Sequence, residues 1–218
     1  FLLAVALLSA GVWRYGYLQA LDQLKPRAQA DLALASDRLA AQLQVYQELA
    51  VLLADHPALI SLEDAGAVTA ARAMLLDVAD KTGAMDVVFA DSTGRVRASA
   101  LGEIGTNVAD TPYFTRAMQG ALGTAHGFFG SRNARAYYYA APTFGAEGRV
   151  RGALIIVADI NKVEQVWRGS NPAVYFTDET GAVFISNRSE LLFWARPAGS
   201  IGLQPPDGTA RSFRATQA

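Results

Sequence analysis

The residues best suited to chemistry in this chain are tyrosines and arginines in the segment 113–139. Tyr113 and Arg116 are three residues apart in a segment expected to be helical, so they share a face. Tyr137 and Tyr139 alternate along a predicted strand and therefore point to one side of it. A guanidinium can hold a carboxylate through two parallel hydrogen bonds, and phenol hydroxyls can complete the oxygen shell. This pattern predicts a binding site for a small anion.

The segment 127–135, GFFGSRNAR, is expected to be a loop that adds Ser131, Arg132 and Arg135 to this group. Simpler interpretations remain open for each residue. The two strand tyrosines fit a core with satisfied hydroxyls, and Arg116 fits a helix charge that faces solvent. For the two loop arginines, a solvated loop is the preferred interpretation from the residues alone.

The sequence carries no motif typical of an enzyme active site, with no GxGxxG, P-loop, GxSxG or HExxH. His56 and His126 lie in different segments without metal-ligand spacing, and the chain has no cysteine. Asp91 and Asp178 are explained by the turns that they open. We therefore expect no catalytic, metal or cofactor site here. A net charge of -1 without a basic block argues against a nucleic-acid partner.

Two adjacent strands are predicted, 135–143 and 150–159, and a glycine-containing turn joins them. The first strand carries Tyr137 and Tyr139. The second strand is apolar without alternation, which is typical of a central strand covered on both faces. Helices are expected over 65–81, with Gly83 as its stop, and over 110–120.

The N-terminal part of the chain has helix composition throughout. Residues 1–14 are apolar up to Trp13 and Arg14, and we interpret them as the end of a transmembrane helix; a signal sequence or a core helix is the alternative. Residues 15–56 form a long helix that Pro26 should kink or restart. Because the chain begins with Phe, we expect it to be a piece of a longer protein.

Two segments of the chain repeat each other without a gap. Residues 87–99, VVFADSTGRVRAS, and 174–186, VYFTDETGAVFIS, are identical at seven of thirteen positions. Turn chemistry alone accounts for Asp, Thr and Gly but not for the flanking Val, Phe and Ser matches. We infer two tandem modules. The first covers 57–168, and the second, smaller and poorer, covers 169–218.

The order of these parts resembles the extracytoplasmic double-Cache sensor region of C4-dicarboxylate transport sensor histidine kinases. The resemblance covers about residues 13–195, and DTPYFTRA, GSRNARAYYYAAP and GALIIVADINKVEQVW carry it. It implies an α+β fold, in which a long N-terminal helix precedes two tandem PAS-like (Cache) modules with antiparallel sheets. It also implies that the first, membrane-distal module binds a succinate-like acid. The implied ligand-binding residues are Tyr113, Arg116, Ser131, Tyr137 and Tyr139.

One position departs from the family pattern. The family strand carries a lysine that helps to hold the second carboxylate, and Val157 stands at that place in this chain. Losing a charge-assisted contact costs about 1.5–3 kcal/mol, which is tenfold or more in affinity. The resemblance then implies a monocarboxylate, an aromatic acid or a less charged ligand, unless Arg132 or Arg135 supplies the second cation.

For the whole protein, the resemblance implies a homodimeric kinase in the bacterial inner membrane, with this region in the periplasm. Its N-terminal helix would hold it in the membrane, and ATP and a response regulator would serve a cytoplasmic part. The ectodomain of a chemoreceptor or of a cyclic-dinucleotide enzyme is the alternative within the same class. A membrane-tethered interaction module without a ligand is the alternative from another class.

Overall fold

The computed structural model describes residues 2–60, 65–102, 104–131, 133–145, 147–197, 199 and 202–206. The chain divides into two compact units, Phe1–Ala40 and Ala41–Ala218. All the residues discussed for the candidate site belong to the second unit.

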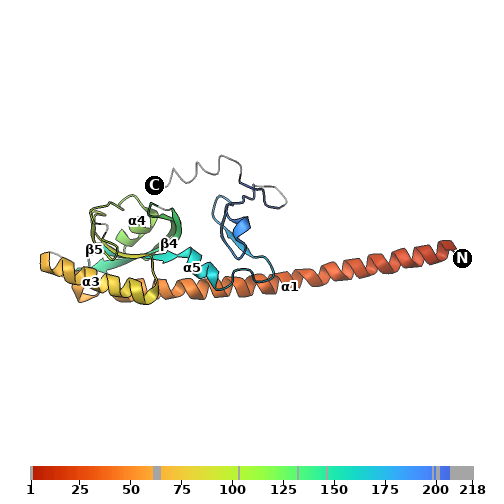
Figure 1. Cartoon of the computed structure of the whole chain (residues 1–218), viewed down its shortest axis with the longest axis horizontal. Helices are drawn as coiled ribbons and strands as arrows, with labels where there is room; N and C mark the ends of the chain where they lie inside the picture. Colours follow the sequence, from red (N-terminus) through yellow and green to blue (C-terminus); the bar gives the residue numbers. More distant parts are fainter. Residues whose placement is uncertain are drawn as a thin grey trace. The chain divides into compact units, whose positions relative to one another are not determined.

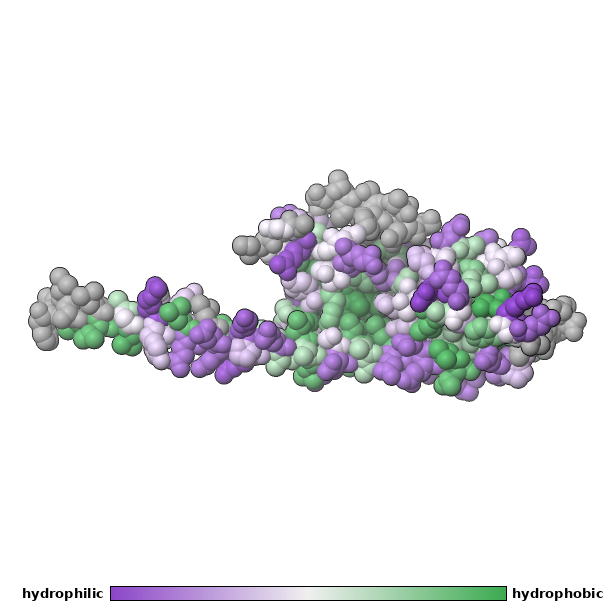
Figure 2. Space-filling view, turned by 180° about the vertical axis from the view of Figure 1, so that it is seen from behind, coloured by the Kyte–Doolittle hydropathy of each residue, from purple (hydrophilic) through white to green (hydrophobic). Residues whose placement is uncertain are grey.

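Helix α1, Leu2–Leu53, is continuous for 52 residues and contains Pro26. The expected restart at this proline is therefore not observed, although proline removes one backbone donor from a helix interior. The side chains of Leu8 and Val12 are exposed. Figure 2 shows hydrophobic residues near the free end of the long helix and a mainly hydrophilic surface further along it. Within the described ranges, we find no helix with the length and apolar character needed to cross a membrane.

The second unit is built on a five-stranded antiparallel sheet with the strand order β2-β1-β5-β4-β3. Its strands are β1 Asp86–Asp91, β2 Val96–Ser99, β3 Gly123–Phe129, β4 Ala134–Phe144 and β5 Val150–Asp159. Strand β5 lies at the centre, and its residues from Gly152 to Ala158 are all buried. The predicted central strand is therefore confirmed.

Helices cover the two faces of this sheet. Helix α3, Ala65–Thr82, and the part of α1 from residue 41 onward lie along one side, whereas α4, Pro112–Met118, lies on the other (Figure 1). The hydroxyl of Tyr46 on α1 donates a hydrogen bond to the carbonyl of Thr82 at 3.4 Å, which joins α1 to α3. The short helix α2, Pro57–Ile60, lies between them in sequence. Both faces are thus buried, as the sequence of β5 indicates.

The expected loop over 127–135 is wrong in its first part. Residues 123–129 form strand β3, which pairs with β4 along its whole length, from Gly123 opposite Ala140 to Phe129 opposite Ala134. The glycines in this segment indicated a loop, but the pairing with β4 satisfies the backbone and outweighs that local preference.

The repeated segments form hairpins with the same register. Strands β6, Tyr175–Thr177, and β7, Val183–Ser186, pair in the same way as β1 and β2, each position being shifted by 87 residues. Each turn is held by an aspartate, because Asp91 Oδ1 accepts from the Thr93 hydroxyl at 2.5 Å and Asp178 Oδ1 accepts from the Thr180 hydroxyl at 2.6 Å.

The second hairpin is all that the described residues contain of a second sheet. It is followed by a 3-10 turn, η1, Ser189–Leu191, and is preceded by the connecting helix α5, Ile160–Gln165, whose N-terminus Asp159 caps. A second complete module remains a prediction, because part of the segment 169–218 lies outside the described residues.

Candidate functional site

Helix α4 presents one side to the sheet. Proline at its first position fits the helix start, where no backbone donor is needed. Tyr113, Phe114 and Ala117 are buried against β3, β4 and β5. Thr111 occupies the N-cap position of α4 but makes no side-chain capping bond.

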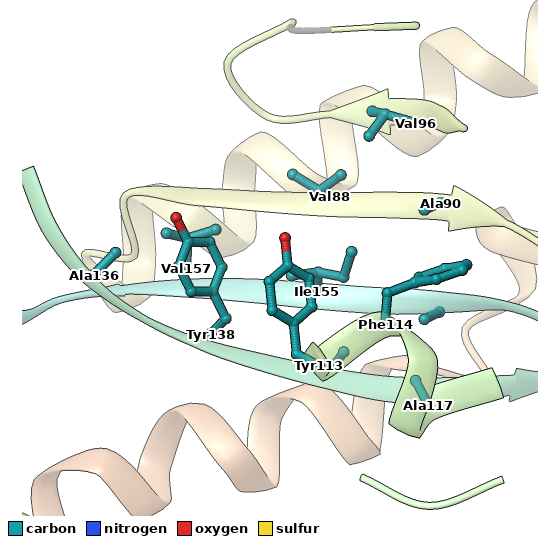
Figure 3. Close-up of a cluster of buried hydrophobic side chains, with 12 residues drawn as sticks. Val88, Ala90, Val96, Tyr113, Phe114, Ala117, Ala136, Tyr138, Ile155 and Val157 are labelled. Carbon is teal, nitrogen blue, oxygen red and sulfur yellow. The ribbon is translucent and has the colours of Figure 1, made fainter. Parts of the chain in front are cut away.

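Tyr113 of α4 stacks on Tyr138 of β4. Their ring centroids are 4.8 Å apart and the ring planes differ by only 5°. Figure 3 shows the two rings standing side by side, with their hydroxyls directed the same way. The Tyr138 hydroxyl donates to the carbonyl of Phe128 on β3 at 2.9 Å. This tyrosine pair joins the helix to the sheet and brings two phenols together inside the protein.

Both phenols are neutral at physiological pH. Burial raises the pKa of the Tyr113 phenol above its ordinary value. Burial, followed by the neighbouring phenol of Tyr113, raises the pKa of Tyr138. A neutral phenol has one hydrogen to donate, and Tyr138 donates its own to Phe128, so the phenol of Tyr113 is the donor of this pair that can serve an oxygen anion.

The surroundings of the tyrosine pair are apolar. Val157 lies opposite Tyr138 in the register of β4 and β5 and is 2% exposed. Val88, Ala136 and Ile155 belong to the same buried cluster (Figure 3). The position where the resemblance predicts a lysine therefore does lie beside a tyrosine, and valine gives it a hydrophobic surface.

Asp86 is a carboxylate that the register places on this face, next to Val157, and Asp159, which caps α5, lies on the same face opposite Ala136. Asp86 is 1% exposed, and its oxygens accept from the Ser99 hydroxyl at 2.8 Å and from the Leu101 amide at 3.2 Å. Burial raises the pKa of this carboxyl, although the hydrogen bond from Ser99 acts in the opposite direction. Asp86 thus anchors the start of the connection from β2 to α4.

We expect the replacement Asp86→Asn to change how stability depends on pH. A raised pKa in the folded state means that folding favours the protonated carboxyl. That contribution is fully present below the ordinary pKa of 3.8 and is lost as pH rises through the folded-state pKa. The stability of the unmodified protein relative to Asp86→Asn should therefore fall from about pH 3 toward neutrality. Urea unfolding of both proteins from pH 3 to pH 7 measures the difference between their free energies of unfolding. A difference that stays constant over this range would contradict the prediction.

The predicted grouping of Tyr113 with Tyr137 and Tyr139 is wrong. The rings of Tyr137 and Tyr139 do lie together, with centroids 5.1 Å apart, as the alternation predicts. They point away from the face that carries Tyr138, because successive strand residues face opposite sides. Helix α4 covers the Tyr138 face, so Tyr113 meets Tyr138. Burial, followed by the neighbouring Tyr137, raises the pKa of Tyr139.

Arg116 does not meet the tyrosines of β4. Its side chain is exposed, and Nη1 donates to Oε1 of Gln119 at 3.3 Å. A helix advances about 100° per residue, so position 116 lies roughly a quarter turn or more from the centre of the buried side formed by residues 113, 114 and 117. Ser131 is exposed in the turn after β3. Arg132 lies outside the described residues.

Arg135 is not a loop residue that faces solvent or a ligand. It is 5% exposed, and both of its terminal nitrogens bond within the chain. Nη1 and Nη2 donate to the two carboxylate oxygens of Glu164 on α5 at 2.6 and 2.7 Å. The prediction that Arg135 supplies a cation to the ligand is therefore wrong, because its charge is already paired.

Two residues at these contacts were missed by the sequence reasoning. The alternation along β4 identifies Tyr138 as a site residue only when the face covered by α4 is known. Glu164 carries a clearer signal, because it lies on the same side of α5 as the buried Ile160 and Val163. An acidic residue on an apolar helix side requires a buried partner.

The arrangement consists of stacked phenols on an apolar surface, which is suited to binding. In the parts of the chain that the structure describes, no three His, Asp or Glu side chains gather in a way that could hold a metal ion. The tyrosine pair supplies neutral hydroxyls, and the cluster beneath it supplies apolar surface.

Comparison with known proteins identifies the class. No family model matches the chain. The chain is 31% identical over 185 residues to the C4-dicarboxylate transport sensor protein DctB of Pseudomonas aeruginosa, which covers 80% of this chain and 30% of that protein. The chain thus spans less than a third of this relative's length.

Two solved structures share the fold. The sensor domain of the histidine kinase DctB from V. cholerae matches with a TM-score of 0.73 and 24% identity, over 82% of this chain and 72% of that one. The ligand-binding domain of the Pseudomonas fluorescens chemoreceptor CtaA, in complex with L-serine, matches with a TM-score of 0.63 and 14% identity, over 80% and 77%. The fold is therefore that of a sensor domain. Within this class, the chain is a DctB-like sensor region.

Proposed function

We propose that this chain is the extracytoplasmic ligand-sensing region of a two-component sensor histidine kinase and that it binds a small organic acid. The binding site is the α4 face of the five-stranded sheet, around Tyr113 and Tyr138. The observation that carries the proposal is this stacked pair of neutral phenols, enclosed between a short helix and a sheet. The similarity to DctB supports it.

The acid lies with its body against the tyrosine pair and Val157, and with its carboxylate toward the rim of α4. Arg116 is on that rim and, being exposed, is free to turn toward an anion. The phenol of Tyr113 donates a hydrogen bond to the acid. Ser131, in the turn after β3, is a further candidate for the rim, and we keep Arg132, its neighbour in sequence, as a candidate as well. Tyr137 and Tyr139 take no part, since they lie on the opposite face of β4 from Tyr138.

Val157 decides the class of acid that we propose. A second carboxylate at this position would be buried against an apolar side chain without a partner, which is costly. We therefore propose a monocarboxylate, including an aromatic one, in preference to a C4-dicarboxylate.

For the whole protein, we propose a homodimer in the bacterial inner membrane, with this region in the periplasm and the N-terminal part of α1 leading to the membrane. Phosphotransfer from ATP, and a response regulator that receives the phosphoryl group, belong to a cytoplasmic part. The ectodomain of a chemoreceptor is the second candidate. The likeness to the CtaA domain favours it, because the two sensor classes share this fold.

The test is a thermal-shift screen with succinate, fumarate, propionate and benzoate. We expect at least one monocarboxylate to raise the melting temperature more than succinate does. Tyr113→Phe should weaken binding of that acid about fivefold to tenfold, because one neutral hydrogen bond contributes about 1 kcal/mol. Arg116→Ala should weaken it further, since it removes a charge-assisted contact.

Tyr137→Phe is the matched control. It removes a phenol hydroxyl from β4, the strand that carries Tyr138, but on the opposite face, and should leave the affinity unchanged. Equal losses in Tyr113→Phe and Tyr137→Phe would contradict the placement of the site. A screen in which no acid stabilises the protein would favour a module that binds no small ligand.

A further inference from the structure

The ion pair between Arg135 and Glu164 connects three elements of the fold. Arg135 is the second residue of β4, Glu164 lies on α5, and the backbone of β7 contacts both. Arg135 Nη1 donates to the carbonyl of Phe184 at 2.6 Å, and Glu164 Oε1 accepts from the amide of Ser186 at 2.9 Å. Nη2 also donates to Oδ1 of Asn161 at 2.7 Å.

The two side chains take the place of a neighbouring strand at one edge of β7. In a strand, the carbonyl of one residue and the amide two positions later point to the same edge, where a partner strand would supply a donor and an acceptor. Here the guanidinium supplies the donor to Phe184, and the carboxylate supplies the acceptor to Ser186. The second hairpin is therefore attached to the main sheet by a pair of charged side chains.

This attachment begins close to the candidate site. Tyr138 is three residues after Arg135 on β4, which is about 10 Å along an extended strand. Both residues are buried; Tyr138 is paired with β3 and with β5, and Arg135 is paired with Phe128 of β3. A displacement at Tyr138 is therefore expected to shift the adjoining part of β4 that carries Arg135.

We propose that Arg135 and Glu164 are positioning residues that transmit ligand binding on β4 to the second hairpin. The inference rests on the proposed function, since it assumes that the acid is bound beside Tyr138. Ligand binding shifts β4, and the ion pair carries the shift into β7 and α5. Neither residue touches the ligand.

A second route exists at the same boundary, and the test must separate it. The ring of Phe184 packs against His126 at 4.7 Å and against Phe128 at 6.0 Å between centroids. These contacts come from β3 and do not involve the ion pair. They should hold the hairpin near the sheet without fixing the edge of β7.

Hydrogen exchange of backbone amides, with and without propionate or succinate, tests the proposal. We compare the unmodified chain, Glu164→Gln and Arg135→Lys, with Arg168→Gln as the control. Arg168 approaches the same carboxylate at 3.8 Å from a half-exposed position. Without acid, both test variants should exchange the amides of 183–186 about tenfold faster, and β1 should remain unchanged. The acid should slow exchange in β4 of every protein. It should slow 183–186 only in the unmodified chain and in Arg168→Gln.

The outcomes separate this inference from the proposed function. If acid slows exchange at 183–186 in Glu164→Gln and Arg135→Lys as well, the aromatic contacts carry the signal and the inference is overturned. If neither acid changes exchange anywhere, the proposed function fails for these acids. The role of the ion pair is then tested by the exchange measured without acid. If Glu164→Gln and Arg135→Lys exchange the amides of 183–186 as slowly as the unmodified chain does, the ion pair does not position β7. Arg135→Lys keeps the charge balance, so it provides a folded protein if Glu164→Gln does not.

Discussion

Replacing Glu164 with leucine is expected to lower the free energy of unfolding by about 3–5 kcal/mol, because it leaves a buried charge without its partner. Glu164 is 0% exposed and Arg135 is 5% exposed, so water cannot replace the lost carboxylate. The amide of Ser186 loses its acceptor as well. Urea unfolding followed by circular dichroism measures the change. The effect should appear as a lower midpoint with a similar slope.

Two further variants give this prediction its control. Arg168→Leu removes a half-exposed ion pair to the same carboxylate and should cost less than about 1 kcal/mol. The double variant Arg135→Met with Glu164→Leu should cost less than the sum of its single variants, because no unpaired charge remains buried. If the double variant loses as much free energy of unfolding as the two single variants together, the ion pair is not the source of the destabilisation.

Local patterns predicted much of the fold. The apolar run of β5 identified a central strand, and the helix composition with Gly83 at its end gave α3 almost to the residue. The two aspartate turns were predicted from the repeat, and Asp91 and Asp178 make the same side-chain bonds in both. These signals succeed because each depends on neighbours that are close in sequence.

The composition of the site could not be predicted in the same way. Alternation along β4 separates Tyr137 and Tyr139 from Tyr138, but it does not say which face α4 covers. That choice depends on where the chain crosses after β2, over residues far from β4. The sequence therefore predicted that Tyr137 and Tyr139 lie beside Tyr113, whereas the ring beside Tyr113 is that of Tyr138.

Arg135 illustrates a limit of a different kind. A buried guanidinium pairs with a carboxylate, and the same chemistry describes a bound acid and a glutamate of the chain. Glu164 is 29 residues away in sequence, so no local pattern connects the two. What the sequence did contain was an acidic residue on the apolar side of α5, which predicts that some cation must be buried there.

The contact between α4 and β3 has the least space, and Gly123→Ala is expected to destabilise the protein by about 3 kcal/mol. A β-carbon at position 123 would overlap the carbonyl oxygen of Tyr113 and lie 2.7 Å from its carbonyl carbon. The obstacle is backbone, so no side-chain rotation can relieve it. To accept alanine, α4 must move away from β3, and this separates Tyr113 from Tyr138. We therefore expect Gly123→Ala to lose the response to acid together with stability.

Gly127→Ala on the same strand is the matched control, because its β-carbon would meet Cε2 of Tyr138 at an ordinary 3.6 Å. It should change the free energy of unfolding by less than about 1 kcal/mol, and the melting temperature should still rise with the acid. Both variants lose one glycine from β3. A difference between their free energies of unfolding therefore reports how closely α4 is packed against the sheet. Equal free energies of unfolding would mean that α4 is not held as close to β3 as the contact between Gly123 and Tyr113 indicates. Normal acid binding by a destabilised Gly123→Ala protein would mean that the contact of Tyr113 with Tyr138 is not needed to bind the ligand.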